Sequence, residues 1–103
     1  MKKIMQQIQR IMQMEEILSK TQQVIDELSP LLEKYHQLQA KISVLSKYYQ
    51  SDEWKEDFAD DEQGKLPATL KRGVLSEDAV WNVLQDEQHL KQQLIDIINF
   101  QAA

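Results

Sequence analysis

The sequence predicts an all-α protein, and two observations support this fold class. The 103 residues include only 2 Gly and 2 Pro, which is too few turn-forming residues for a β-sandwich or a barrel. Apolar residues make up 42% of the chain, and they recur every three or four positions, as on one face of an α-helix. We therefore expect one helical domain over residues 1–103. Cysteine is absent, which excludes disulfides and thiol chemistry.

Residues 3–49 are predicted to form one long helix with a heptad pattern. Most a and d positions are apolar, which gives the helix a seam for a partner helix, as in a coiled coil. An apolar g series begins at Ile17 and widens this stripe. Pro30 would kink a continuous helix, whereas Ser29 and Pro30 together could also cap and begin a second helix. The heptad register passes Pro30 unshifted, which favours one long, kinked helix.

Residues 50–75 are predicted to form an ordered connection that begins with a short acidic helix. Ser51 is the expected N-cap of that helix, and acidic residues follow in its first turn, where the helix dipole favours them. Gly64 and Gly73 are expected in turns with positive φ. The apolar face of this segment is formed by Trp54, Phe58 and Leu66.

A last helix is predicted over residues 76–100, with Ser76 as its N-cap. Its apolar seam contains one acid, Glu87, which we expect to pair with a Lys, Tyr or Gln. Two apolar-striped helices joined by an ordered connection indicate an antiparallel helical hairpin.

Charge is concentrated in two adjacent segments. The net charge is −5, and residues 51–63 alone hold seven acids and one lysine, whereas residues 64–75 hold three basic residues and no acid. Two interpretations are open: the segments neutralise each other within the fold, or the 51–63 face binds a basic partner. The residues concerned, as a partner surface or as a local core, are Tyr48, Tyr49, Trp54, Asp57, Phe58, Asp61, Lys71 and Arg72.

The sequence offers little support for catalysis or for a cofactor. His36 and His89 lie on glutamine-rich helix faces without a metal-binding motif. The carboxylates of Asp57, Asp60, Asp61 and Glu62 could gather a divalent cation, but the EF-hand pattern is absent. We expect a non-enzymatic protein without metal or cofactor, and a carboxylate–metal enzyme is the least favoured alternative.

The long helix predicts an interaction protein that self-associates. At 1.5 Å per residue, residues 3–49 span about 70 Å and residues 76–100 only about 38 Å. The last helix would therefore leave an apolar strip near the N-terminus uncovered, and a homodimer is the simplest cover. The alternative is an inhibitor of the antitoxin or immunity type that acts through the 51–63 face. The strip consists of Ile4, Ile8, Ile11, Met14 and Leu18.

Neither nucleic acid nor membrane is expected as a partner. Nucleic-acid binding requires a basic face, and the aromatic residues adjoin the most acidic segment. No segment approaches the ~20 apolar residues of a membrane-spanning helix. We therefore expect a cytoplasmic location.

A specific block of residues supports a family resemblance. It comprises Tyr48-Tyr49, Ser51, Trp54, Asp57-Phe58, Asp61-Glu62, Gly64, Leu66-Pro67 and the run LKRGVLSED over residues 70–78. With this block, the chain resembles a bacterial family of small helical proteins described only as a domain of unknown function. The N-terminal helix matches only in its heptad pattern. The resemblance implies a mostly helical fold, and it implies no activity, cofactor or site residue.

Overall fold

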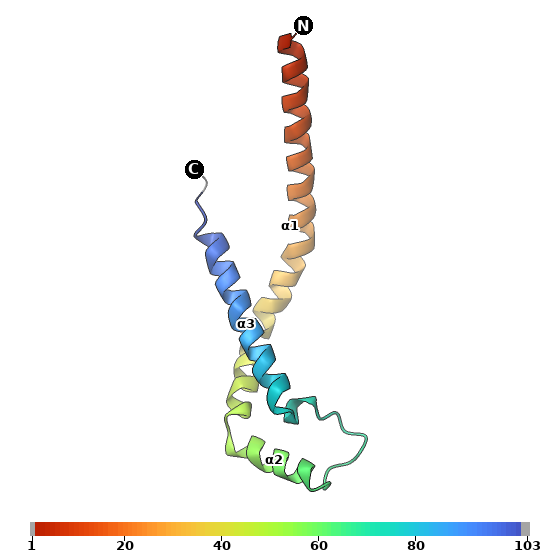
Figure 1. The fold of residues 1–103 in the computed structure, drawn as a ribbon, viewed down its shortest axis with the longest axis vertical. Coiled ribbons are helices and arrows are strands. Elements are labelled where there is room, and N and C mark those ends of the chain that lie inside the picture. The colour runs from red at the N-terminus through yellow and green to blue at the C-terminus, as the bar shows by residue number, and fades with distance from the viewer. Residues whose placement is uncertain (1, 102–103) are drawn as a thin grey trace. The chain divides into compact units, whose positions relative to one another are not determined.

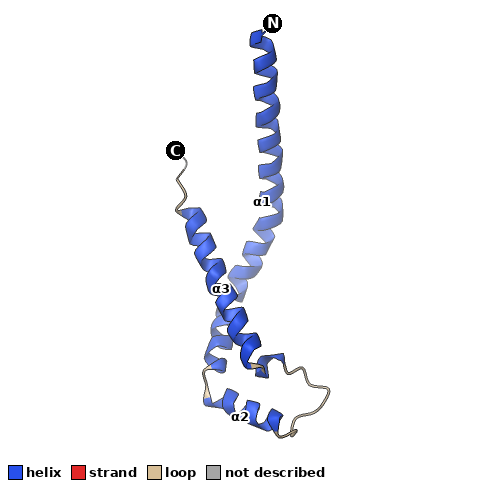
Figure 2. Ribbon diagram, viewed as in Figure 1, coloured by secondary structure: helices blue, strands red, loops and turns tan. Residues whose placement is uncertain are grey.

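The computed structural model describes residues 2–101 and confirms the all-α class (Figures 1 and 2). Within this range there are three α-helices and no strand. The helices are α1 (Lys2–Tyr49), α2 (Asp52–Glu62) and α3 (Glu77–Ile98), and a 3₁₀ turn, η1 (Gly73–Leu75), precedes α3.

Helix α1 continues through Pro30, so the alternative of a turn at this position is wrong. Proline has no N–H to donate to the carbonyl of Asp26, four residues earlier, which removes one helical hydrogen bond. Side-chain pairs one turn apart support the helix on its polar faces. These include Gln22–Asp26 (2.9 Å), Gln23–Glu27 (3.2 Å) and Lys20–Glu16 (2.8 Å).

The chain divides into two compact units, residues 1–41 and residues 42–103. The described part of the first unit is helical throughout, and none of its side chains is buried. The second unit contains the end of α1, followed by α2, η1 and α3, and holds the buried apolar residues Trp54, Leu75 and Val80. The antiparallel hairpin and the single domain stay predictions.

Both expected N-caps are present in the second unit. The Ser51 hydroxyl accepts a hydrogen bond from the backbone N–H of Trp54 (3.2 Å) and donates one to the carbonyl of Tyr48 (2.6 Å). The Ser76 hydroxyl accepts one from the backbone N–H of Ala79 (3.4 Å). Each serine satisfies an N–H group that the first turn of a helix leaves without a partner.

Gly64 has the predicted positive φ (71°), but the same prediction for Gly73 is wrong. Gly73 begins η1, in which the N–H of Leu75 donates to the carbonyl of Arg72 and the N–H of Ser76 donates to that of Gly73. This right-handed turn requires negative φ.

Two helix boundaries also differ from the prediction. Helix α2 ends at Glu62, and the turn at Gly64 follows, so Leu66 lies beyond the helix and not on its apolar face. Helix α3 ends at Ile98, with Asn99 as its C-cap, and does not reach residue 100.

Candidate functional site

Three aromatic residues from α1 and α2 form a cluster in the second unit. The Trp54 ring stacks on Phe58 at a centroid distance of 5.2 Å and an interplanar angle of 19°. Tyr49 meets Trp54 edge-on at 5.2 Å and 74°. Trp54 is only 8% exposed, so the cluster is a local core and Trp54 is not an exposed partner contact.

Two hydrogen bonds connect this aromatic cluster to the chain that follows α2. The indole N–H of Trp54 donates to the carbonyl of Val74 (2.9 Å), and the Tyr49 hydroxyl donates to the carbonyl of Glu77 (3.0 Å). The acceptors lie 20 and 28 residues further along the sequence. These bonds order the end of the connection and the start of α3.

Tyr48 and Asp57 form a short side-chain hydrogen bond. The Tyr48 hydroxyl donates to a carboxylate oxygen of Asp57 at 2.6 Å. This bond favours the neutral phenol and, together with desolvation and the nearby carboxylates, raises the pKa of Tyr48 from 10.0 to about 12. Asp57 is therefore engaged in holding α2 against the end of α1.

The acidic and basic segments pair with each other in part. Arg72 and Asp61 form an ion pair at 3.0 Å, and Lys65 lies 3.8 Å from Asp60. Lys71 is exposed. Several acids of α2 also remain exposed, namely Asp52, Glu53, Glu56 and Glu62.

A small apolar pocket of about 220 Å³ lies where the end of α1, η1 and the start of α3 meet. This pocket was not predicted from the sequence. A Cβ atom on Gly73 would meet no atom within 4 Å, so there is room for a side chain at this position. The lining residues are Leu45, Gly73, Val74, Ala79, Val80 and Val83.

The predicted N-terminal strip is exposed in the structure of one chain. We use this name for Ile4, Ile8, Ile11, Met14 and Leu18, whose exposed fractions range from 51% to 63%. More apolar residues of α1 are also exposed beyond the strip. They include Ile17, Val24, Ile25, Leu28, Leu31 and Leu32, at 40–58%.

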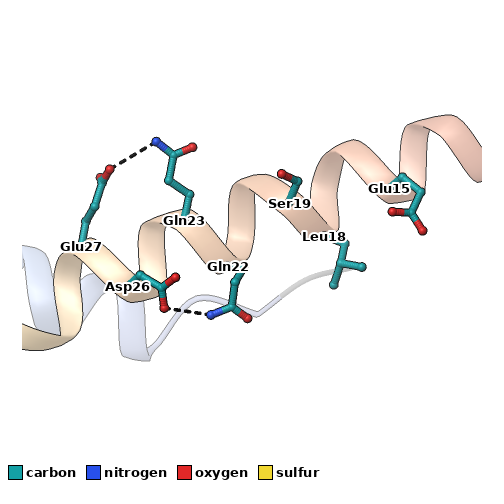
Figure 3. Close-up of a pocket in the computed structure, with 7 residues that line it drawn as sticks. All are labelled: Glu15, Leu18, Ser19, Gln22, Gln23, Asp26 and Glu27. Atoms are coloured by element: carbon teal, nitrogen blue, oxygen red, sulfur yellow. Dashed lines mark hydrogen bonds between the residues drawn. The ribbon is translucent and has the colours of Figure 1, made fainter.

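The polar surface beside this strip has no features of a small-molecule site. Figure 3 shows a shallow depression that is lined by α1 alone, from Glu15 to Glu27. Its Gln22 and Gln23 side chains donate to Asp26 and Glu27 on the next turn (Figure 3). All its lining residues are exposed, whereas ligand pockets enclose most of the surface of their ligand.

The candidate residues for metal binding and proton transfer do not come together in one site in the described part of the chain. Within residues 2–101, no three His, Asp or Glu side chains are placed to hold a metal ion. His36 and His89 are both exposed. Glu87 is buried to 9% exposure and forms an ion pair with Lys91 on the next turn of α3 (3.2 Å). In the same range, no helix has the length and apolar character needed to cross a membrane.

Comparison with known proteins identifies a family but not an activity. No curated protein and no solved structure matches this sequence. A family described as a domain of unknown function (DUF4298) matches residues 11–97, which is most of the chain, and the chain therefore belongs to this family.

Proposed function

We propose that this chain is a non-enzymatic interaction protein that self-associates through a coiled-coil seam on residues 2–41 of α1. The observation that carries the proposal is the N-terminal strip, in which five apolar side chains are more than half exposed on a helix without a buried residue. Soluble proteins rarely leave such contiguous apolar surface in water. A second copy covers it by two-fold symmetry.

The free energy of covering the strip is close to the cost of association. In the dimer, five such side chains from each copy lose half of their area to the partner. Each of the ten contributes about 1 kcal/mol, which gives ~10 kcal/mol in all. Losing translational and rotational freedom costs about 4–15 kcal/mol. A stable dimer therefore needs apolar surface from α1 beyond the strip, and residues 17–32 supply it.

The absence of an enzymatic role is part of this proposal. The polar residues of the second unit that were candidates for chemistry have structural partners: Asp57 accepts from Tyr48, Asp61 pairs with Arg72, and Glu87 pairs with Lys91. The bacterial origin and the cytoplasmic location stay predictions from the sequence.

Light scattering after gel filtration tests the proposal at tens of micromolar protein. We expect a mass of about twice 12.1 kDa. Ile11→Asp, which places a charge in the strip, should shift the protein towards monomer. Gln13→Asp is the matched control, because it adds the same charge two residues away and outside the strip. A monomeric mass for the unmodified protein contradicts the proposal.

The second candidate, an inhibitor that acts through the 51–63 face, is supported by the exposed acids of α2. The Asp52 side chain is fully exposed, and Lys55 only approaches it to 4.0 Å. The test is capture of a basic protein. If the capture is lost with Asp52→Asn and Glu56→Gln but kept with Ile11→Asp, the result favours this candidate over self-association.

A further inference from the structure

Charge along the first part of α1 falls into two blocks of opposite sign. Residues 2–12 contain three basic residues and no acid. Residues 13–33 contain five acids and one lysine, a net charge of −4. All these charged side chains are exposed. Lys3 and Arg10 hold g positions beside the seam, whereas Asp26, Glu27 and Glu33 hold b and c positions further from it, so the two blocks interact through their summed charge.

The direction of the second copy decides which blocks meet. A parallel, in-register pair places the two basic blocks side by side and the two acidic blocks side by side. Like charges that face each other across an interface destabilise the pair. An antiparallel pair brings each basic block against the acidic block of the other copy. Charge complementarity therefore favours the antiparallel direction.

Several overlaps of an antiparallel pair let a positions meet d positions. Those that place residue 4, an a position, beside residue 28 or residue 35, both d positions, lay the N-terminal strip against the exposed apolar residues of α1 beyond it. One register places Arg10 at the level of residue 22 and the other at the level of residue 29, on either side of Asp26 and Glu27. Lys3 then stands at the level of residue 29 or residue 36, a stretch that contains Glu33 and Lys34.

The same overlap supplies the apolar surface that the strip alone lacks. In either register, the N-terminal strip of one copy lies against residues 14–35 of the other. This part of α1 carries Val24, Ile25, Leu28, Leu31 and Leu32, each 40–58% exposed. Two-fold symmetry repeats the contact, so each copy contributes both halves of the seam.

We propose that the partner of the α1 seam is a second copy of this chain running antiparallel, with residues 2–12 of each copy alongside the acidic block of the other. This inference rests on the proposed self-association and adds its direction and register.

Distance measurement between spin labels tests the direction, and the absence of native cysteine makes single labels unambiguous. A nitroxide on Gln6→Cys should lie about 30–40 Å along the helix axis from the same label on the other chain. That second label stands at the level of residues 26–33 of the first chain. A nitroxide on Ser19→Cys should lie within about 10 Å along the axis, because residue 19 is near the two-fold centre.

The two labels separate failure of the inference from failure of the proposed function. A long distance at Gln6 with a short axial offset at Ser19 supports the antiparallel dimer. Short distances at both positions, in a protein of dimeric mass, overturn the inference and leave self-association standing. A monomeric mass without dipolar coupling between chains overturns both.

A charge-reversal cycle provides an independent test of the same overlap. Arg10→Glu places an acid alongside the acidic block of the other copy, on the side of the seam that carries Glu27, and we expect it to weaken the dimer about fivefold over the two symmetric sites. Glu27→Lys, at a c position on the same side of the seam as Arg10, should weaken it similarly, and the double variant should recover most of the affinity. Circular dichroism of each variant checks that the helix is retained. Additive losses in the double variant would contradict the proposed register.

Discussion

Replacing Trp54 by alanine removes the centre of the aromatic cluster. The side chain is 8% exposed, stacks on Phe58, meets Tyr49 edge-on and donates to the carbonyl of Val74. Removing a buried aromatic side chain costs about 3–5 kcal/mol. Because Phe58 and Tyr49 are only half-buried and can move into the space, we expect a loss of about 3 kcal/mol in the free energy of unfolding.

Urea denaturation followed by circular dichroism measures this loss, at one fixed protein concentration because association shifts apparent stability. Trp81→Ala is the matched control: Trp81 is 53% exposed, and its removal should cost less than about 1 kcal/mol. Trp54→Phe keeps ring packing but loses the N–H donor, so an intermediate loss of about 1–2 kcal/mol is expected. Equal losses for the two alanine variants would refute the assignment of Trp54 to the core.

Two further predictions concern the turns and the tyrosine–aspartate bond. Gly64→Ala should destabilise the protein by about 1 kcal/mol in the same urea experiment, because Gly64 has a φ of 71°, whereas Gly73→Ala should be neutral or slightly stabilising. Absorbance titration should place the pKa of Tyr48 at about 12, and Asp57→Asn should lower it. Because the folded state binds this proton more tightly, the stabilisation is complete below pH 10 and is lost as the pH rises from about 10 to 12. A Tyr48 that titrates near pH 10 in the unmodified protein would contradict the hydrogen bond to Asp57.

Local signals in the sequence predicted the helices and their start points. The heptad register indicated that α1 continues through Pro30, because a chain reversal has no reason to preserve a seven-residue count. Ser51 and Ser76 were recognisable as caps from the acids that follow them. The resemblance to a family of unknown function is confirmed over residues 11–97.

Features that depend on contacts between distant residues could not be predicted. Composition left open whether the segments 51–63 and 64–75 neutralise each other or the acidic face binds a basic partner, because the pairing of Asp61 with Arg72 depends on how the connection folds. The apolar pocket at Gly73 could not be predicted either, because its lining depends on η1 being a right-handed turn. A glycine permits either sign of φ, so the sequence alone did not distinguish the two turns.

The described part of the first unit has no buried side chain of its own. Helices gain most of their stability from tertiary packing, and in the proposed dimer the second copy would supply that packing to residues 2–41. Dilution would therefore loosen this helix while the second unit keeps its aromatic core. If the proposed dimer forms, the cellular abundance of the protein would set, through mass action, how much of this helix is ordered, and expression level would control the structure of residues 2–41.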